Sequence, residues 1–108
     1  MIDKIMTAAG FRLNETYRKT RFVSPPADKT YAVYMDDVSV DGPDGMNRIY
    51  THSYTIELYE PAPDDAAESA IETALNAEGL RWEKQDRYWL QDEQLYQTVY
   101  DFTYIKKL

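Results

Sequence analysis

Residues 50–58 read YTHSYTIEL, and the stretch alternates between two kinds of side chain. The first set is aromatic, aliphatic or histidine: Tyr50, His52, Tyr54, Ile56 and Leu58. The second set is small and polar or acidic: Thr51, Ser53, Thr55 and Glu57. Successive side chains of a β-strand point to opposite faces, so the alternation predicts a strand with one packed and one solvated face. The preceding segment, Tyr31 to Val38, is also strand-like, and we expect the two to pair as an antiparallel hairpin.

The connection between these strands, residues 36–48, reads DDVSVDGPDGMNR and partly matches a calcium-binding loop. Counted from Asp37, oxygen-bearing side chains stand at loop positions one, three and five, and Gly42 stands at position six. An EF-hand loop also needs a glutamate at position twelve and a flanking helix on each side. Position twelve here is Arg48, and both flanks are strand-like. Proline and glycine among aspartates are typical of turns, so we predict a hairpin turn, with weak divalent-metal binding as the alternative.

Two segments have the periodicity of amphipathic helices. They are residues 2–9 and residues 65–78, and each is followed directly by a glycine, the residue that most easily adopts the left-handed conformation at a helix end. The second segment carries a continuous apolar stripe: Ala67, Ala70, Ile71, Ala74 and Leu75. Asp65 and Glu68 predict an acidic variant of the capping box at its start.

Three further segments have strand composition. Residues 17–23 (YRKTRFV) are basic and run into a pair of prolines. Residues 80–90 (LRWEKQDRYWL) and 95–105 (LYQTVYDFTYI) are joined by the acidic sequence QDEQ, which suits a hairpin. Both faces of the last segment carry apolar groups, so we expect a helix to cover one face and a neighbouring subunit the other. The order α-β-β-β-α-β-β predicts an α+β fold, with two helices packed on a largely antiparallel sheet.

Length and composition narrow the class of protein. A chain of 108 residues suits one domain, residues 1–108. The absence of cysteine excludes disulfides and thiolate sites and is consistent with a reducing cytoplasm. A net charge of −7 disfavours a surface that binds nucleic acid. The N-terminal MIDKIMTAAGF does not suit a signal peptide, and no apolar run approaches the ~18 residues of a membrane span.

The sequence contains few groups suited to catalysis. His52 is the only histidine, so a metal site would lack a second imidazole, and we expect this residue to be hydrogen-bonded in the core or at its rim. No serine stands in a nucleophile-elbow context, and no glycine-rich loop precedes a helix. The aromatic final strand lacks the interleaved basic residues and the element order of an RNA-binding sheet. We therefore predict no enzymatic activity, no cofactor and no bound metal.

Four consecutive stretches resemble the small tail-completion, or tail-terminator-like, proteins of long-tailed bacteriophages and prophages. They are PPADKTYAVYMDD, NRIYTHSYTIELYEP, the alanine-rich helix and LRWEKQDRYWLQDEQLYQTVYDF, and together they cover nearly the whole chain. In that family a proline-rich lead enters a YxVY strand, ELY precedes the helix, a W/YEK strand follows, and LYQxxY opens the last strand. The resemblance implies one tail-terminator-like domain in a non-enzymatic, minor tail protein that carries no cofactor.

The same resemblance implies self-assembly at the head–tail junction. Such proteins form rings, typically hexameric, that cap the tail tube at its head-proximal end and receive the DNA-filled head. The implied partners are further copies of the chain, the major tail protein and the head–tail connector proteins, with no specific nucleic-acid binding and no membrane. The implied location is the virion tail, and the host cytoplasm during assembly. An acidic lumen would let DNA pass without sticking.

A ring-forming protein needs interface residues, and the sequence offers aromatic anchors, a basic strip and an acidic loop over residues 36–48 that orders on assembly. The candidates are Trp89, Tyr100 and Tyr104; Arg18, Lys19 and Arg21; and Asp37 and Asp41. The alternative for each group is a core aromatic, a solvated strand face or a hairpin tip. Trp82 and Trp89 lie in one predicted strand at a separation that places them on opposite faces, so one of them is expected to pack and the other to be free.

Two functions of other classes stay open from the sequence. An acidic inhibitor or nucleic-acid mimic would concentrate carboxylates on one face and bind a basic partner in a salt-sensitive manner. A small metal-dependent enzyme would use the aspartates of residues 36–48, and a metal titration would then raise its thermal stability.

Overall fold

The computed structural model describes residues 1–42 and 48–107, which form two helices and a six-stranded sheet. The helices are α1 (Ile2–Ala8) and α2 (Asp65–Ala77). The strands are β1 (Tyr17–Lys19), β2 (Tyr31–Asp41), β3 (Ile49–Glu60), β4 (Trp82–Lys84), β5 (Tyr88–Leu90) and β6 (Leu95–Lys107). The α+β class and the order of elements are as predicted, except that the segment predicted as one strand at residues 80–90 forms both β4 and β5.

The sheet has the order β1-β2-β3-β6-β4, and β5 pairs with the first residues of β6. The β1–β2 pairing is parallel, and the other pairings are antiparallel. The hairpin predicted between β2 and β3 is confirmed, in register from Tyr31 opposite Tyr59 to Asp41 opposite Ile49. Strand β6 runs along the other side of β3, with Lys107 opposite Ile49. These three long strands form the centre of the sheet.

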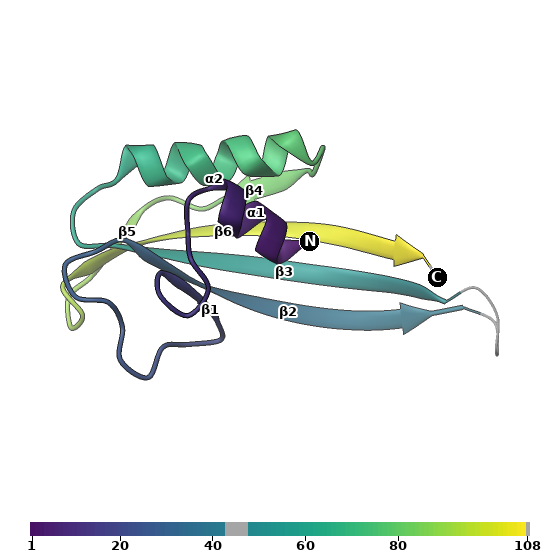
Figure 1. Cartoon of the computed structure of the whole chain (residues 1–108), viewed down its shortest axis with the longest axis horizontal. Helices are drawn as coiled ribbons and strands as arrows, with labels where there is room; N and C mark the ends of the chain where they lie inside the picture. Colours follow the sequence, from purple (N-terminus) through teal and green to yellow (C-terminus); the bar gives the residue numbers. More distant parts are fainter. Residues whose placement is uncertain (43–47, 108) are drawn as a thin grey trace.

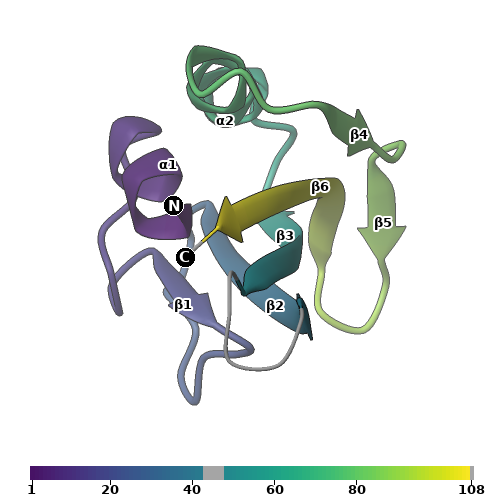
Figure 2. The same ribbon diagram turned by 90° about the vertical axis from the view of Figure 1, so that its right-hand side faces the viewer.

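Both helices lie on the same side of the sheet (Figures 1 and 2). The alternation in YTHSYTIEL determines which side this is, because Tyr54, Ile56 and Leu58 are buried whereas Ser53, on the other face, is exposed. Burying one large apolar side chain contributes about 1.5–3 kcal/mol to the stability of the fold. If β3 presented its other face to the helices, Tyr54, Ile56 and Leu58 would be exposed and these contributions would be lost. The core consists of Ile2, Ile5, Met6, Phe11, Tyr17, Ala32, Tyr54, Ile56, Leu58, Ile71, Ala74, Leu75, Tyr100 and Phe102.

The C-terminal ends of both helices are as predicted from the sequence, whereas the N-terminal cap of α2 differs from the prediction. Gly10 and Gly79 have positive φ angles of 92° and 67°, as predicted for the residues that follow the helices. At the start of α2 the predicted cap of Asp65 with Glu68 is wrong. Asp64 is the N-cap, and its side chain accepts a hydrogen bond from the Ala67 N–H at 3.0 Å. Glu68 is turned instead toward cations from another part of the chain, which sequence spacing does not show.

The segment 80–90 is interrupted as a strand at residues 85–87, so its tryptophans belong to two strands. Trp82 stands opposite Phe102 and packs edge-on against Tyr100, with ring centroids 5.8 Å apart. Trp89 stands opposite Tyr96 and packs against it at 4.8 Å. The prediction that the two tryptophans occupy opposite faces of one strand is therefore wrong. The alternation of side chains between the two faces holds only within a continuous strand, and this strand is broken between Trp82 and Trp89.

The connection predicted over residues 36–48 is shorter than expected. Strand β2 continues to Asp41 and β3 begins at Ile49, so Asp37 and Asp41 are strand residues and not part of a flexible loop; residues 43–47 lie outside the described part of the chain. In an extended strand, alternate residues lie about 7 Å apart. Asp37, Ser39 and Asp41 therefore do not converge on one ion, which calcium would require at about 2.4 Å.

Candidate interaction surface

Beyond the helices the three long strands continue as a slender extension (Figure 1), which we call the distal arm and define as residues 37–41, 49–53 and 103–107. The protein measures 49 × 28 × 23 Å, and the arm lies along the longest dimension. Its apolar side chains Val38, Val40 and Ile105 are 43%, 48% and 55% exposed. Val38 and Val40 lie on the same face as His52, and Ile105, which stands opposite Thr51, lies on the other face. The arm therefore exposes aliphatic side chains on both faces, whereas a single exposed one would need no explanation.

Aromatic rings close the core at the root of the arm. His52 stacks on Tyr54 with ring centroids 5.4 Å apart, and Tyr104 lies 6.1 Å from His52. Nδ1 of His52 is 2.9 Å from Oδ1 of Asp36 on the neighbouring strand. The expectation of a hydrogen-bonded rim histidine is confirmed. Among the residues that the structure describes, no three histidine, aspartate or glutamate side chains are grouped so that they could hold a metal ion.

The predicted basic strip lies at one edge of the sheet. Arg18 and Lys19 belong to β1, Arg21 follows it, and all three are exposed. Tyr17 anchors this short strand, because its ring is 2% exposed and its hydroxyl donates a hydrogen bond to Asp3 in α1 at 2.7 Å. The expected strand at 17–23 is only three residues long, but the three cations remain available to a partner.

The three predicted aromatic anchors occupy different environments. Trp89 is 38% exposed and is accompanied by Tyr88, which is 65% exposed, so β5 presents an aromatic surface. Tyr104 is half-buried on the arm. Tyr100 is fully buried, and its hydroxyl donates a hydrogen bond to Glu72 in α2 at 2.7 Å. Tyr100 therefore has no surface to offer a partner and is a core residue, because the helix-facing side of β6 lies directly beneath α2.

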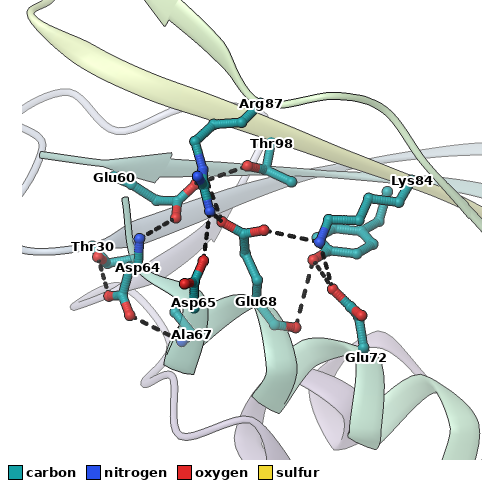
Figure 3. Close-up of polar contacts among 11 residues, drawn as sticks. Thr30, Glu60, Asp64, Asp65, Ala67, Glu68, Glu72, Lys84, Arg87 and Thr98 are labelled. Atoms are coloured by element: carbon teal, nitrogen blue, oxygen red, sulfur yellow. Dashed lines mark hydrogen bonds and ion pairs between the residues drawn. The ribbon is translucent and has the colours of Figure 1, made fainter. Parts of the chain in front are cut away.

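A partly buried ionic cluster joins α2 to the sheet (Figure 3). Glu68 of α2 accepts hydrogen bonds from Arg87 at 2.6 Å and forms an ion pair with Lys84 at 2.9 Å. Arg87 also reaches Asp65 at 2.8 Å. Below them, Glu60 is 0% exposed and accepts hydrogen bonds from the Thr98 hydroxyl at 2.7 Å and the Asp64 N–H at 2.8 Å. The break at residues 85–87 is what brings Arg87 over this cluster.

The two buried carboxyl groups have opposite pKa shifts. Burial, followed by hydrogen bonding with Glu68, raises the pKa of Glu60 to about 7. Burial acts to raise the pKa of Glu68 as well, but hydrogen bonds with Glu60, Lys84 and Arg87 outweigh it and lower that pKa to about 2. Glu60 is thus neutral and Glu68 ionised over a wide range around pH 5, an arrangement that lets the two neighbours avoid mutual repulsion.

The free energy of unfolding should therefore fall between pH 4.5 and pH 7. Glu60 stays protonated in the folded state over this interval while it ionises in the unfolded chain, so protons are bound preferentially by the folded state and stability decreases as pH rises. Glu68 acts in a separate interval, since its favourable contribution is lost only as pH falls from about 4.5 toward 2. Urea denaturation of the wild type and Glu60→Gln at pH 5 and pH 7.5 measures the effect. An equal decrease in both proteins would contradict it.

One of the three described cavities borders this cluster, because Asp64 lines it. One shallow cavity of about 380 Å³ lies on the face of the sheet opposite the helices and is lined by residues including Arg81, Glu83, Asp101 and Thr103. Asp101 already accepts a hydrogen bond from Thr55 at 2.8 Å. Glu60, Glu68 and Arg87 line none of the three described cavities. The cluster joins α2 to the sheet, and Asp64, whose N–H donates to Glu60, lines an open cavity of about 340 Å³ beside it.

Sequence reasoning did not identify Glu60, Glu68 and Arg87 as a unit. One signal was available for Glu60, because it continues the inward-facing series Tyr54, Ile56, Leu58 by two residues and so falls on the packed face of β3. A carboxyl group in that position needs partners, which the sequence does not name.

No helix in the described residues is both long and apolar enough to cross a membrane. No protein-family model and no curated protein matches the sequence. Among solved structures, the fold is similar to a chain in a structure described as the virion of a native gene transfer agent particle. The match has a TM-score of 0.58 and 13% sequence identity, and it covers 92% of this chain and 81% of the other. The two chains therefore share an α+β fold over nearly the whole of the present protein.

Proposed function

We propose that this protein is a non-enzymatic structural subunit of a phage-like virion, and that within the virion it acts as a ring-forming tail-completion subunit at the head–tail junction. The observation that carries the proposal is the fold shared, over 92% of the chain, with a component of a virion particle. The resemblance of the sequence to tail-terminator-like proteins supports the finer assignment. The distal arm supports it too, because its exposed apolar residues provide surface for neighbouring subunits.

The proposed partners follow from this role. The chain associates with further copies of itself, a hexamer being the expectation from the resemblance, and contacts the major tail protein below and a head–tail connector protein above. We assign these contacts to the exposed Trp89 with Tyr88, to the half-buried Tyr104 on the arm, and to the exposed strip Arg18, Lys19 and Arg21. The proposed location is the head-proximal end of the tail, reached from the host cytoplasm during assembly.

The acidic-inhibitor alternative is less well supported by the structure. An inhibitor that imitates nucleic acid needs its carboxylates on a shared outer face. Here Glu60, Glu68 and Glu72 are directed into the contact between α2 and the sheet, and Asp36 and Asp64 are bonded to His52 and to the start of α2. These five of the 19 acidic side chains hold the fold together, so they are not available to a basic partner.

Deleting the gene from a genome that produces the particles should uncouple heads from tails. We expect filled heads without tails, together with loose tails of uncontrolled length, because no ring would terminate the tube or receive the head. Negative-stain electron microscopy of induced lysates shows the result, and a plasmid copy of the intact gene should restore complete particles. Normal virions from the deletion strain would overturn the proposal.

A further inference from the structure

The outer side of β2 is unpaired along the arm. The first residues of β2 form backbone hydrogen bonds on this side with the residues that flank β1. The Ala32 N–H donates to the Thr16 carbonyl, and the Thr20 N–H donates to the Tyr34 carbonyl, both at 2.8 Å. Alternate residues of a strand direct their backbone groups to the same side, so those of Asp36, Val38 and Val40 also point outward. Strand β1 pairs only as far as Tyr34, and within the described residues no strand pairs with β2 on this side beyond it.

The outer side of β6 is unpaired at the same end of the molecule. The Gln85 N–H donates to the Val99 carbonyl at 2.9 Å, which places the backbone groups of Thr103, Ile105 and Lys107 on the side away from β3. Strand β4 pairs with β6 only from Tyr100 to Phe102, and no strand in the described part of the chain continues this edge. The arm is therefore a three-stranded sheet with two open edges.

These edges lack most of the features that prevent an unpaired edge strand from pairing with a strand of another molecule. Natural edge strands are usually short, or carry prolines, bulges or lysines, because unpaired backbone groups attract other strands. Strand β2 runs in unbroken register with β3 to Asp41, and its outer edge has no proline. The residues whose backbone groups point outward include the exposed Val38, Val40 and Ile105. Such edges are suited to pairing with another strand.

The charges on the two edges are opposite. Asp37 and Asp41 are exposed on the β2 edge, whereas the β6 edge ends in the exposed Lys106 and Lys107. Asp41 and Lys107 lie at the same level of the arm and on the same face, since both stand opposite Ile49. Pairing two β2 edges would bring aspartates together and pairing two β6 edges would bring lysines together, so charge favours the unlike combination.

We propose that the β2 edge of one copy pairs with the β6 edge of the next copy, so that the sheets of successive subunits form one continuous sheet. Strands β2 and β6 run in the same direction within the arm, so the new pairing is parallel and Asp41 lies beside Lys107 of the neighbouring copy. A contact between two different edges is heterologous and therefore generates a ring when the rotation between copies closes. The inference rests on the proposed function in that it assumes self-association.

Charge exchange tests this contact directly. Asp37→Lys/Asp41→Lys makes both edges basic, and Lys106→Glu/Lys107→Glu makes both edges acidic. Each variant alone should dissociate to monomers at low salt, with an apparent dissociation constant raised about tenfold or more. Mixing the two variants in equal amounts should restore assembly, because unlike edges meet again. The chain that carries all four exchanges should also assemble. Sedimentation velocity measures all of these states.

The control is Asp92→Lys/Glu93→Lys, which changes the charge by the same amount in the exposed turn between β5 and β6 and should leave assembly intact. If the wild type assembles and the variants assemble equally well, the edge contact is wrong and the ring proposal stands. If the wild type stays monomeric at every concentration, both the edge contact and the ring are wrong. If assembly responds as expected but the deletion strain makes normal virions, the contact holds and the tail function fails.

A proline exchange tests the backbone hydrogen bonds separately from the charges. Because the Val38 N–H points outward, Val38→Pro removes a donor from the edge without removing a hydrogen bond to β3. We expect it to abolish assembly, whereas Val38→Ala, which keeps the N–H, should only weaken it. Circular dichroism shows whether the monomer remains folded. Assembly of a folded Val38→Pro variant at the wild-type level would overturn the proposed strand pairing.

Discussion

Replacing Tyr100 with alanine is expected to lower the free energy of unfolding by about 3 to 5 kcal/mol, because a fully buried ring is lost from a close-packed core. The ring packs against Trp82 at 5.8 Å, and Nζ of Lys84 lies 5.7 Å from its centroid, so a cavity at this position would loosen β4 as well as α2. Urea denaturation followed by tryptophan fluorescence measures the change, since Trp82 reports on the affected contact.

Two further variants distinguish a core role for Tyr100 from an interface role. Tyr100→Phe keeps the ring and removes only the hydroxyl that bonds to Glu72, so it should cost about 1 to 2 kcal/mol. Trp89→Ala removes an exposed ring on β5 and should cost about 1 kcal/mol or less in the isolated chain. If Tyr100→Ala left the isolated chain as stable as Trp89→Ala does, the placement of Tyr100 in the core would be wrong.

The second large effect is expected for Glu60→Ala, at about 2 to 4 kcal/mol. The substitution removes the acceptor of the Thr98 hydroxyl and of the Asp64 N–H, and the Thr98 side chain is itself fully buried. A buried donor without a partner carries its full desolvation cost, and the missing side chain leaves a void. Thermal and urea denaturation at pH 5.5, where Glu60 is protonated, give the loss without a contribution from its ionisation.

Glu60→Gln is the matched control, because glutamine has the shape of a neutral glutamic acid and retains an acceptor oxygen. We expect it to cost less than about 1.5 kcal/mol at pH 5.5 and to bring the protein nearer to, or above, wild-type stability at pH 7.5. A glutamine variant as unstable as the alanine variant at pH 5.5 would contradict the expectation that a neutral side chain can replace Glu60 there.

The long elements were predictable because their signals are local. Residues 50–58 have the two-residue period of a strand buried on one face, and the structure places Tyr54, Ile56 and Leu58 in the core. The apolar stripe of residues 65–78 likewise produced α2 to within one residue. Hydrophobic burial requires one side of each element to be apolar, so apolar residues recur in the sequence with the period of the helix or the strand.

The short elements were not predictable in the same way. The chain between Trp82 and Trp89 has the composition of one strand, but the strand is interrupted at residues 85–87, where Arg87 pairs with the carboxylates of Glu68 and Asp65. Those partners come from α2, far away in sequence. Likewise, nothing in residues 17–23 indicated that only Tyr17 to Lys19 would pair with β2, and in parallel orientation.

The burial of the residues of β6 was predictable in part. The sequence indicated that β6 carries apolar groups on both faces, and exposed apolar residues are indeed present on it and on β2. It did not separate Tyr100 from Tyr104, although both belong to the same inward-facing series of β6. Their difference in burial depends on distance along the strand: Tyr100 lies under α2, whereas Tyr104 lies out toward the arm, beside His52.

The residues of this chain contain enough local information to specify the positions of the long elements, the inward face of β3 and the glycines that follow both helices, because burial and backbone conformation act over a few neighbouring positions. The tertiary structure alone reveals how far β2, β3 and β6 extend beyond the helices, which edges of the arm stay open, and which carboxylates meet Arg87. Those properties depend on pairing between segments that are distant in sequence. They also decide whether an apolar side chain such as Val40 is buried in the core or exposed on the arm.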